Sequence, residues 1–219
     1  MKISLLGGTG DIAEGLVLRW TKAGHDIYIG SRSEEKATGI ADGYNKRLFE
    51  LGIESDIQGG VNADAAAASE VIVISLPYEY AVSTLEQIKS SLEDQIVISP
   101  VVPMSRVGKV FMYTTPAQGS AAQEIKEALP ESVRLVSAYH NLPASELKEI
   151  DRVLDYDVVL CGDDDGAKEV VKNLTEEMEN LRALDAGPLE ASMMIEAITP
   201  LIVNLNVRYK PQHFSVKFV

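Results

Sequence analysis

Four glycines lie close together near the start of the chain, within the stretch LLGGTGDIAEGL. Three small residues of this stretch, Gly8-x-Gly10-x-x-Ala13, have the spacing that binds the pyrophosphate of a dinucleotide when it joins a strand to a helix. The first glycine is expected to make a tight turn, the second to leave room for the pyrophosphate, and the small third residue to let helix and strand pack closely. The phosphates would meet free N–H groups at the positive end of the helix dipole. The alternative is a glycine turn that binds nothing.

The cofactor preference is predicted from the end of the second expected strand. About twenty residues after the glycine motif, NAD-binding proteins carry an Asp or Glu for the ribose 2′-hydroxyl. Here the sequence YIGSRSEEK places Ser31 and Arg32 at that position, with Lys36 one turn later. A hydroxyl, a guanidinium and an ammonium suit a 2′-phosphate. We predict NADP rather than NAD, the alternative being that Arg32 and Lys36 are solvated residues paired with Glu34 and Glu35.

Strands and helices alternate over the first two thirds of the chain. Apolar runs predict strands at residues 2–7, 25–29, 70–77, 95–99 and 133–137, and helical spacing recurs between most of them. This order predicts parallel βαβ units, and therefore an α/β fold with a Rossmann-type, doubly wound parallel sheet. The rhythm changes after Pro143. We predict an NADP-binding domain over residues 1–144 and a smaller C-terminal α/β domain over residues 145–219.

Composition limits the classes of partner. The 219 residues are 46% hydrophobic and 24% charged, which is typical of a soluble globular protein. The formal net charge of −13 would repel nucleic acids and anionic membranes, so we expect neither as a partner. Cys161 is the only cysteine, which fits a reducing cytosol, and no apolar run approaches membrane-spanning length. We expect a cytoplasmic location.

Five segments extend the pattern beyond a generic dinucleotide motif. They are LLGGTGDIAEGL, IGSRSEEK, SPVVPMSR, CGDDDGAKEVV and LDAGPLEASMMIEAITPLI. Together they resemble the coenzyme F420-dependent NADP reductases, which are small archaeal and bacterial enzymes. The resemblance implies an oxidoreductase that moves a hydride between reduced 8-hydroxy-5-deazaflavin, coenzyme F420, and NADP.

The resemblance also implies which residues contact the cofactors. It implies NADP contacts on the glycine loop, at the 2′-phosphate, after the strand that ends at Pro77, and beside the nicotinamide. On the glycine loop these residues are Thr9, Gly10, Asp11 and Ile12, and at the 2′-phosphate they are Ser31, Arg32 and Lys36. After Pro77 they are Tyr78 and Val82, and beside the nicotinamide they are Met104 and Ala144. The C-terminal sequence RYKPQHFSVKFV lacks glycines expected from the family, in a segment that helps to form its deazaflavin site.

Hydride transfer between these two cofactors needs no catalytic triad, and we expect no catalytic side chain. His140 follows an expected strand and is a candidate for the ring pocket, for a general acid or for a structural role, and the adjacent Asn141 is a candidate to hold the carboxamide. An imine or carbonyl reductase, which needs a proton donor such as His140 or Tyr139, is the alternative enzyme. A non-catalytic NADP-sensing module is the alternative from another class.

The remaining candidates have structural and functional interpretations. Cys161 is expected to act as a small apolar residue within a strand, and the acidic run at residues 163–165 to begin a helix rather than bind a metal. Met193 and Met194 are expected to pack, or to face the second ring. A basic cluster is expected to bind the charged deazaflavin tail or to be solvated, and consists of Arg208, Lys210 and Lys217. The long apolar helix over residues 190–207, together with the resemblance, predicts a homodimer.

Overall fold

The computed structural model of the chain describes residues 1–8 and 10–219. Within them the main sheet has eight strands in the order β3-β2-β1-β4-β5-β8-β9-β10. The strands are β1 (Lys2–Leu6), β2 (Asp26–Ser31), β3 (Gln58–Val61), β4 (Val71–Ile74), β5 (Ile96–Ser99), β8 (Arg134–Ser137), β9 (Asp157–Gly162) and β10 (Arg182–Asp185). Neighbouring strands from β3 through β2, β1, β4 and β5 to β8 are parallel to one another, so their carboxyl ends meet at one edge of the sheet. The predicted Rossmann-type fold is confirmed.

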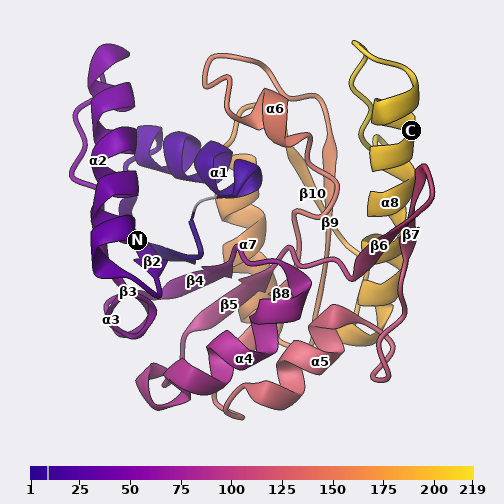
Figure 1. Cartoon of the computed structure of the whole chain (residues 1–219), viewed down its shortest axis with the longest axis horizontal. Helices are drawn as coiled ribbons and strands as arrows, with labels where there is room; N and C mark the ends of the chain where they lie inside the picture. The colour runs from indigo at the N-terminus through magenta and orange to yellow at the C-terminus, as the bar shows by residue number, and fades with distance from the viewer. Residues whose placement is uncertain (9) are drawn as a thin grey trace.

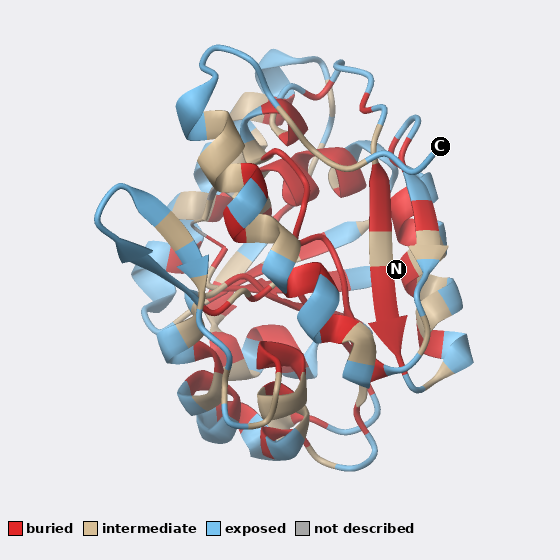
Figure 2. Ribbon diagram, turned by 90° about the vertical axis from the view of Figure 1, so that its right-hand side faces the viewer, coloured by how far each residue is buried: buried red, intermediate tan, exposed pale blue. Residues whose placement is uncertain are grey.

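Helices cover both faces of the sheet (Figure 1). One face carries α1 (Asp11–Lys22), α2 (Glu34–Glu50) and α7 (Asp165–Glu176), and the other carries α3 (Asn62–Ala67), α4 (Tyr78–Ile88) and α5 (Ala121–Ala128). Strand side chains alternate between two cores: Val71 and Val73 of β4 point to the first face, and Ile72 and Ile74 to the second. Figure 2 shows the result, with buried central strands and exposed outer faces on the helices. A strand covered on both faces reads as a continuous apolar run, which is why β4 was visible in the sequence.

The chain after residue 144 extends the same sheet. β9 pairs antiparallel with β8, with Ser137 opposite Cys161, and β10 pairs parallel with β9. A short helix, α6 (Ala144–Leu147), precedes β9, and the long helix α8 (Ser192–Arg208) follows β10 and continues through the buried Pro200. Two 3-10 turns complete the elements, η1 (Lys89–Ser91) and η2 (Leu189–Ala191). The division into two domains at residue 144 stays a prediction.

A small hairpin stands apart from the main sheet. Its strands are β6 (Met104–Val107) and β7 (Val110–Tyr113), joined through Gly108, whose φ of +62° lies in the left-handed region. In Figure 1 the hairpin lies beside α8. The side-chain amide of Asn204 on α8 accepts a hydrogen bond from Phe111 N and donates one to Phe111 O, each over 2.8 Å. The hairpin, β3 and α6 were not predicted from the sequence.

No helix in the described part of the chain has both the length and the apolar character that crossing a bilayer requires.

Candidate dinucleotide site

The glycine turn lies at the carboxyl edge of the sheet, where the strand order reverses between β1 and β4. Gly7 N donates to Gly30 O over 2.8 Å, and Ser75 N donates to Leu6 O over 2.9 Å, so the strands on both sides of β1 hold the turn. Gly7 has a φ of +76°, which only glycine adopts without strain. Gly7 and Gly8 both lie in the turn, and its left-handed position falls on Gly7, one residue before the glycine to which we assigned the turn.

The N-terminus of α1 forms a cradle of backbone N–H groups. Gly10 is the N-cap residue and supplies no side chain to these donors. A Cβ added at Gly10 would lie 3.7 Å from Ser75 Oγ, which is only 9% exposed as a residue and whose hydroxyl has no hydrogen-bond partner among the described residues. Free helical N–H groups beside an unpartnered hydroxyl fit a pyrophosphate. Ile12 is half-buried on α1, whereas Thr9 and the side chain of Asp11 lie outside what the structure describes.

Ala13, the third small residue of the motif, and Gly15, which follows the motif, have packing roles. Ala13 is fully buried between α1 and the sheet, as predicted. Gly15 faces α6, and a Cβ added there would lie 2.5 Å from Leu147 Cγ. Gly15 therefore allows α6 to approach α1, a contact between residues 132 positions apart (147 minus 15) that the sequence did not reveal.

The predicted 2′-phosphate residues follow β2. Ser31 ends the strand, and Ser33 Oγ caps α2 by accepting from Lys36 N over 3.3 Å. Arg32 and Lys36 are exposed, and neither forms an ion pair with a carboxylate within residues 1–8 and 10–219. Pairing with Glu34 and Glu35 is therefore not seen in the described residues, although both side chains are solvated, as the alternative also expected.

Tyr80 was missed by sequence reasoning although it contacts a predicted site residue. Its ring lies on α4, and the Arg32 guanidinium carbon stands 5.6 Å from the ring centroid. Tyr44 was missed as well; its hydroxyl donates to Gly8 O over 2.9 Å and ties α2 to the glycine turn. No sequence signal identifies either tyrosine, because both contacts join elements that are separated along the chain.

Tyr78 and Val82 lie on the first turns of α4, directly after the end of β4. Tyr78 OH donates to Glu124 Oε2 of α5 over 2.7 Å. Burial, together with this hydrogen bond, raises the pKa of Tyr78 to about 12, so the phenol stays protonated at neutral pH. Val82 is half-buried one turn later.

Met104 is exposed at the start of the β6–β7 hairpin, and opposite it in the register is Tyr113. Tyr113 OH donates to Glu196 Oε2 of α8 over 2.8 Å, and the same carboxylate accepts from the N–H groups of Ala121 and Ala122 at the start of α5. Burial raises the pKa of Glu196, while its three donors oppose that change. The buried carboxylate thus fixes the hairpin, and with it Met104, relative to α5 and α8.

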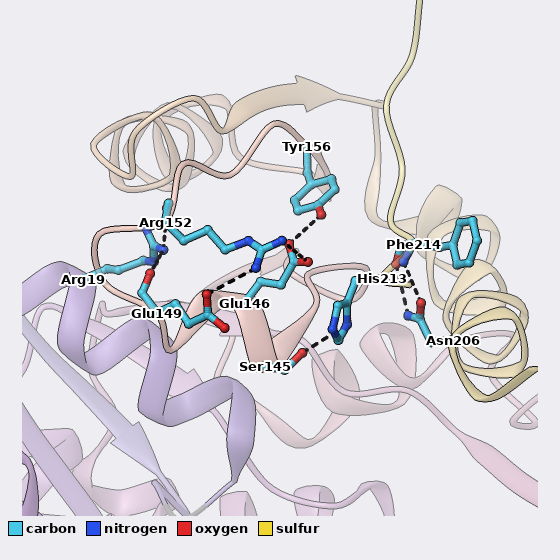
Figure 3. Close-up of polar contacts among 9 residues, drawn as sticks. All are labelled: Arg19, Ser145, Glu146, Glu149, Arg152, Tyr156, Asn206, His213 and Phe214. Carbon is cyan, nitrogen blue, oxygen red and sulfur yellow. Dashed lines mark hydrogen bonds and ion pairs between the residues drawn. The ribbon is translucent and has the colours of Figure 1, made fainter. Parts of the chain in front are cut away.

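Ala144 begins α6, which a set of polar contacts fixes against α1 (Figure 3). Arg19 of α1 donates to the carbonyls of Leu147, Glu149 and Arg152 over 2.7–2.9 Å. Glu146 is buried and accepts from Arg152 Nη2 over 2.8 Å and from Tyr156 OH over 2.6 Å. Because these contacts hold α6 against α1, they place Ala144 near the helix that begins at the glycine turn.

His140 is buried after β8 and its ring Nε2 lies 3.3 Å from Ser137 Oγ. Burial lowers the pKa of His140 to about 3, so the imidazole is neutral at pH 7 and has no acidic proton to give. The Asn141 amide donates to Asp157 O over 2.7 Å and to Ser215 Oγ over 3.3 Å. The NH2 of Asn141 is therefore used by β9 and the C-terminal tail, whereas its Oδ1 is buried with no hydrogen-bond partner among the described residues, so the role of Asn141 as a carboxamide ligand stays a prediction.

Comparison with known proteins agrees with this geometry. Residues 2–103 match the family described as NADP oxidoreductase, coenzyme F420-dependent. The chain is 42% identical to the F420-dependent NADP reductase of Methanocaldococcus jannaschii, over 99% of this chain and 97% of that protein. It is 36% identical to the enzyme of the same name from Methanothermobacter thermautotrophicus, over 99% and 94% of the two chains.

The chain belongs to the F420-dependent NADP reductase family.

Solved structures support the same fold. A crystal structure from Arthrobacter sp. FB24, assigned as an F420-dependent NADP reductase, has a TM-score of 0.84 at 22% identity and is covered over 99% of its length. An imine reductase from Bacillus cereus has a TM-score of 0.61 at 15% identity, with 62% of its chain covered. At these identities the likeness extends to the fold alone, which the F420-dependent NADP reductases share with other oxidoreductases.

Two further features of this family member are structural. Cys161 is buried in β9, and burial raises the pKa of its thiol to about 11, so it is not a reactive thiolate. The acidic run begins α7 as expected: Asp164 caps the helix by accepting from Ala167 N over 2.7 Å, Asp163 accepts from Leu189 N over 2.9 Å, and Asp165 pairs with Lys168.

Hydrogen bonds hold the C-terminal tail of this F420-dependent NADP reductase family member to α6 and α8. His213 Nδ1 lies 3.4 Å from Ser145 Oγ. The side-chain amide of Asn206 donates to Phe214 O and accepts from Phe214 N, as Figure 3 shows. Lys217 pairs with Asp155. The expectation of a three-residue basic cluster is therefore corrected, because Lys217 is committed to a carboxylate.

Proposed function

We propose that the protein transfers a hydride between reduced coenzyme F420 and NADP. The observation that carries this proposal is the glycine turn at the point where the strand order reverses, with two exposed cations beside it that have no carboxylate partner in the described chain. Membership of a family whose named members are F420-dependent NADP reductases supports the identity of the second cofactor.

The residues of the glycine turn would hold the pyrophosphate, with Thr9, Gly10, Asp11 and Ile12 as the proposed contacts. The unpartnered Ser75 hydroxyl supports this fit, since a buried polar atom usually has a partner. Ser31, Arg32 and Lys36 would bind the 2′-phosphate, as charge-assisted hydrogen bonds are strong and directional.

The chain's other proposed contacts serve to position and to exclude water. Tyr78 and Val82 would line the cofactor beside α4, and Met104 and Ala144 would lie by the nicotinamide. When bound, the two cofactors supply the chemistry, because the reduced deazaflavin releases a hydride that the nicotinamide accepts and a proton that passes to solvent. The protein contributes orientation, which for well-aligned reactants can lower the activation free energy by about 7–11 kcal/mol. The neutral His140 supports a mechanism without a side-chain acid.

One spectrophotometric experiment tests the proposal against its alternatives. Purified protein given NADPH and oxidised F420 should bleach the visible deazaflavin absorbance with a matching loss of NADPH, in the absence of any imine or carbonyl compound. NADPH loss only with an imine or carbonyl present would favour the alternative reductase. NADP binding without turnover of any of these substrates would favour a sensing module.

We infer that two copies of the chain associate through α8. Exposed apolar side chains lie on α8 and on the adjacent hairpin, which Asn204 bonds to α8, and they are Met193, Met194, Leu201, Val110 and Met112. Large apolar patches on a protein surface commonly mark interaction sites. Analytical ultracentrifugation should give the mass of a dimer, and Leu201→Glu should shift it toward the monomer. A wild-type monomer at micromolar concentration would contradict this inference.

Arg208 and Lys210 are proposed to bind the charged deazaflavin tail, and neither pairs with a carboxylate in the described residues. Lys210→Glu should raise the KM for F420 and leave the KM for NADP unchanged; equal effects on both would count against this role. A cytoplasmic location is proposed from the unpaired Cys161 and should be visible by fractionation of the native cells.

A further inference from the structure

A contact between Arg32 and Tyr80 joins the segments that follow β2 and β4, the two strands on either side of β1. Arg32 directly follows β2, and Tyr80 lies on the helix that follows β4. Both strands are direct neighbours of β1 in the sheet. The guanidinium carbon stands 5.6 Å from the ring centroid, within the range of a cation–π interaction.

The ring is the partner that the structure gives to Arg32. No carboxylate pairs with this guanidinium in the described part of the chain, whereas the ring of Tyr80 is 47% exposed and available at the surface. Tyr78, two positions earlier on the same helix, turns away to Glu124 of α5. Residues two apart on a helix face different sides, so Tyr80 alone of this pair can reach the end of β2.

A guanidinium stacked on a ring keeps its N–H edge free. Arginine is planar, and its edge presents a fork of donors that matches a phosphate while its face contacts an aromatic ring. Holding the side chain in place beforehand also lowers the entropy lost when a ligand binds. An ion pair with a carboxylate would instead occupy the donors that a phosphate needs.

We propose that Tyr80 is a specificity-determining residue that positions the Arg32 guanidinium for the 2′-phosphate of NADP. This inference rests on the proposed function, in which Arg32 binds that phosphate. It predicts that removing the ring weakens the binding of ligands that carry the 2′-phosphate and does not change the binding of ligands that lack it.

Calorimetric titration with two fragments tests the proposal without deazaflavin or turnover. The probes are 2′,5′-ADP, which carries the phosphate, and 5′-AMP, which lacks it. Tyr80→Leu should raise the Kd for 2′,5′-ADP by about 2- to 5-fold, the range of an exposed cation–π contact, and leave the Kd for 5′-AMP unchanged. Tyr80→Phe keeps the ring and should bind both probes like the wild type. Phe49→Leu removes an exposed aromatic ring from the far end of α2 and serves as the matched control.

A double-mutant cycle separates positioning from direct contact. If the ring acts through Arg32, Tyr80→Leu should have no effect on 2′,5′-ADP binding when Arg32→Ala is already present. Equal weakening of both probes would overturn the proposal, because it would indicate a general adenosine contact. Tighter binding of 2′,5′-ADP to Tyr80→Leu, or no change, would overturn it as well.

The same titrations distinguish failure of this inference from failure of the proposed function. A wild-type protein that does not prefer 2′,5′-ADP over 5′-AMP would contradict the NADP assignment itself. A clear wild-type preference that survives Tyr80→Leu would contradict only the role of Tyr80.

Discussion

Two groups of basic side chains in this protein differ in their partners: one group pairs with carboxylates and backbone carbonyls, and the other has no carboxylate partner in the described residues. Around α6, Arg47 pairs with Glu14 and donates to Lys148 O over 2.8 Å, and Lys148 Nζ pairs with Glu14 over 2.9 Å. After β2, Arg32 and Lys36 have no carboxylate partner in the described chain. The first group joins α1, α2 and α6, whereas the second is exposed beside the glycine turn.

The difference separates charges that build the fold from charges that await a ligand. A guanidinium whose donors are all used by the protein has none left for a phosphate. In a chain of net charge −13, carboxylates are abundant, so two neighbouring cations without one are informative. Removing a member of the first group should lower stability, and removing a member of the second should lower only binding.

Arg19 of α1 also belongs to the first group, because it donates to three backbone carbonyls, those of Leu147, Glu149 and Arg152, and the largest effect is expected there. Arg19→Met keeps the apolar stem but leaves these acceptors unpaired, which should lower the free energy of unfolding by about 3 kcal/mol. Urea denaturation measures the change. Arg19→Lys should rescue little of it, because one ammonium cannot replace the fork. A loss under about 1 kcal/mol for Arg19→Met would break the comparison.

Arg32→Ala should have the converse effect. Loss of a charge-assisted hydrogen bond to the 2′-phosphate costs about 1.5–3 kcal/mol, so the Kd for NADP should rise about 10- to 150-fold. The Kd for NAD should change little, and the free energy of unfolding should stay within about 0.5 kcal/mol of the wild type. Calorimetry and urea denaturation give the two quantities. If NAD and NADP weaken alike, Arg32 does not read the 2′-phosphate.

A smaller effect is expected from adding one methyl group where α1 meets α6. Gly15→Ala would place a Cβ 2.5 Å from Leu147 Cγ, so it should lower the free energy of unfolding by about 1–2 kcal/mol despite the better helix propensity of alanine. Gly39→Ala is the matched control on α2, because a Cβ there meets nothing within 4 Å and should stabilise by about 0.5–1 kcal/mol. Thermal unfolding of both variants should therefore shift in opposite directions, and shifts of the same sign would contradict the packing argument.

The most gradual effect concerns pH. The hydrogen-bonded Arg182 guanidinium lowers the pKa of the Asp157 carboxyl below its usual value. A lowered pKa contributes stability above the unfolded-state value of about 4 and loses that contribution as the pH falls through the folded-state value. The stability difference between wild type and Asp157→Asn should therefore be largest at neutral pH and shrink below about pH 4. Urea midpoints across this range measure it, and a constant difference would show that the charge of Asp157 does not contribute this stability.

Much of the fold was predictable because its signals are local. β4 is a continuous apolar run, and Gly24, with a φ of +92°, follows the C-cap of α1 at the position where glycine commonly ends a helix. β3 was missed because its sequence QGGV has little strand propensity. A Cβ at Gly60 would lie 2.5 Å from the Tyr28 hydroxyl, so packing against a neighbour, rather than propensity, demands that glycine.

The site divides in the same way. The glycine spacing and the Ser31, Arg32 and Lys36 group follow from adjacent residues and one strand-to-helix repeat. The left-handed residue of the turn, Gly7, was not identified because two glycines stand next to each other in the sequence, and the backbone conformation and the hydrogen bond to Gly30 distinguish them only in the structure. Tyr80 was invisible, since its partner lies 48 positions away (80 minus 32) and no periodicity connects them.

The sequence by itself determined the sheet with its alternating helices, the dinucleotide motif and the family, since each depends on residue types at short, fixed spacing. Only the tertiary structure decided that β9 runs antiparallel to β8, that Gly15 exists to admit α6, and that Arg32 rests on an aromatic ring instead of a carboxylate. The physical reason is that these features depend on which surfaces meet after the chain has folded, and contacts between distant segments leave no periodic trace along it.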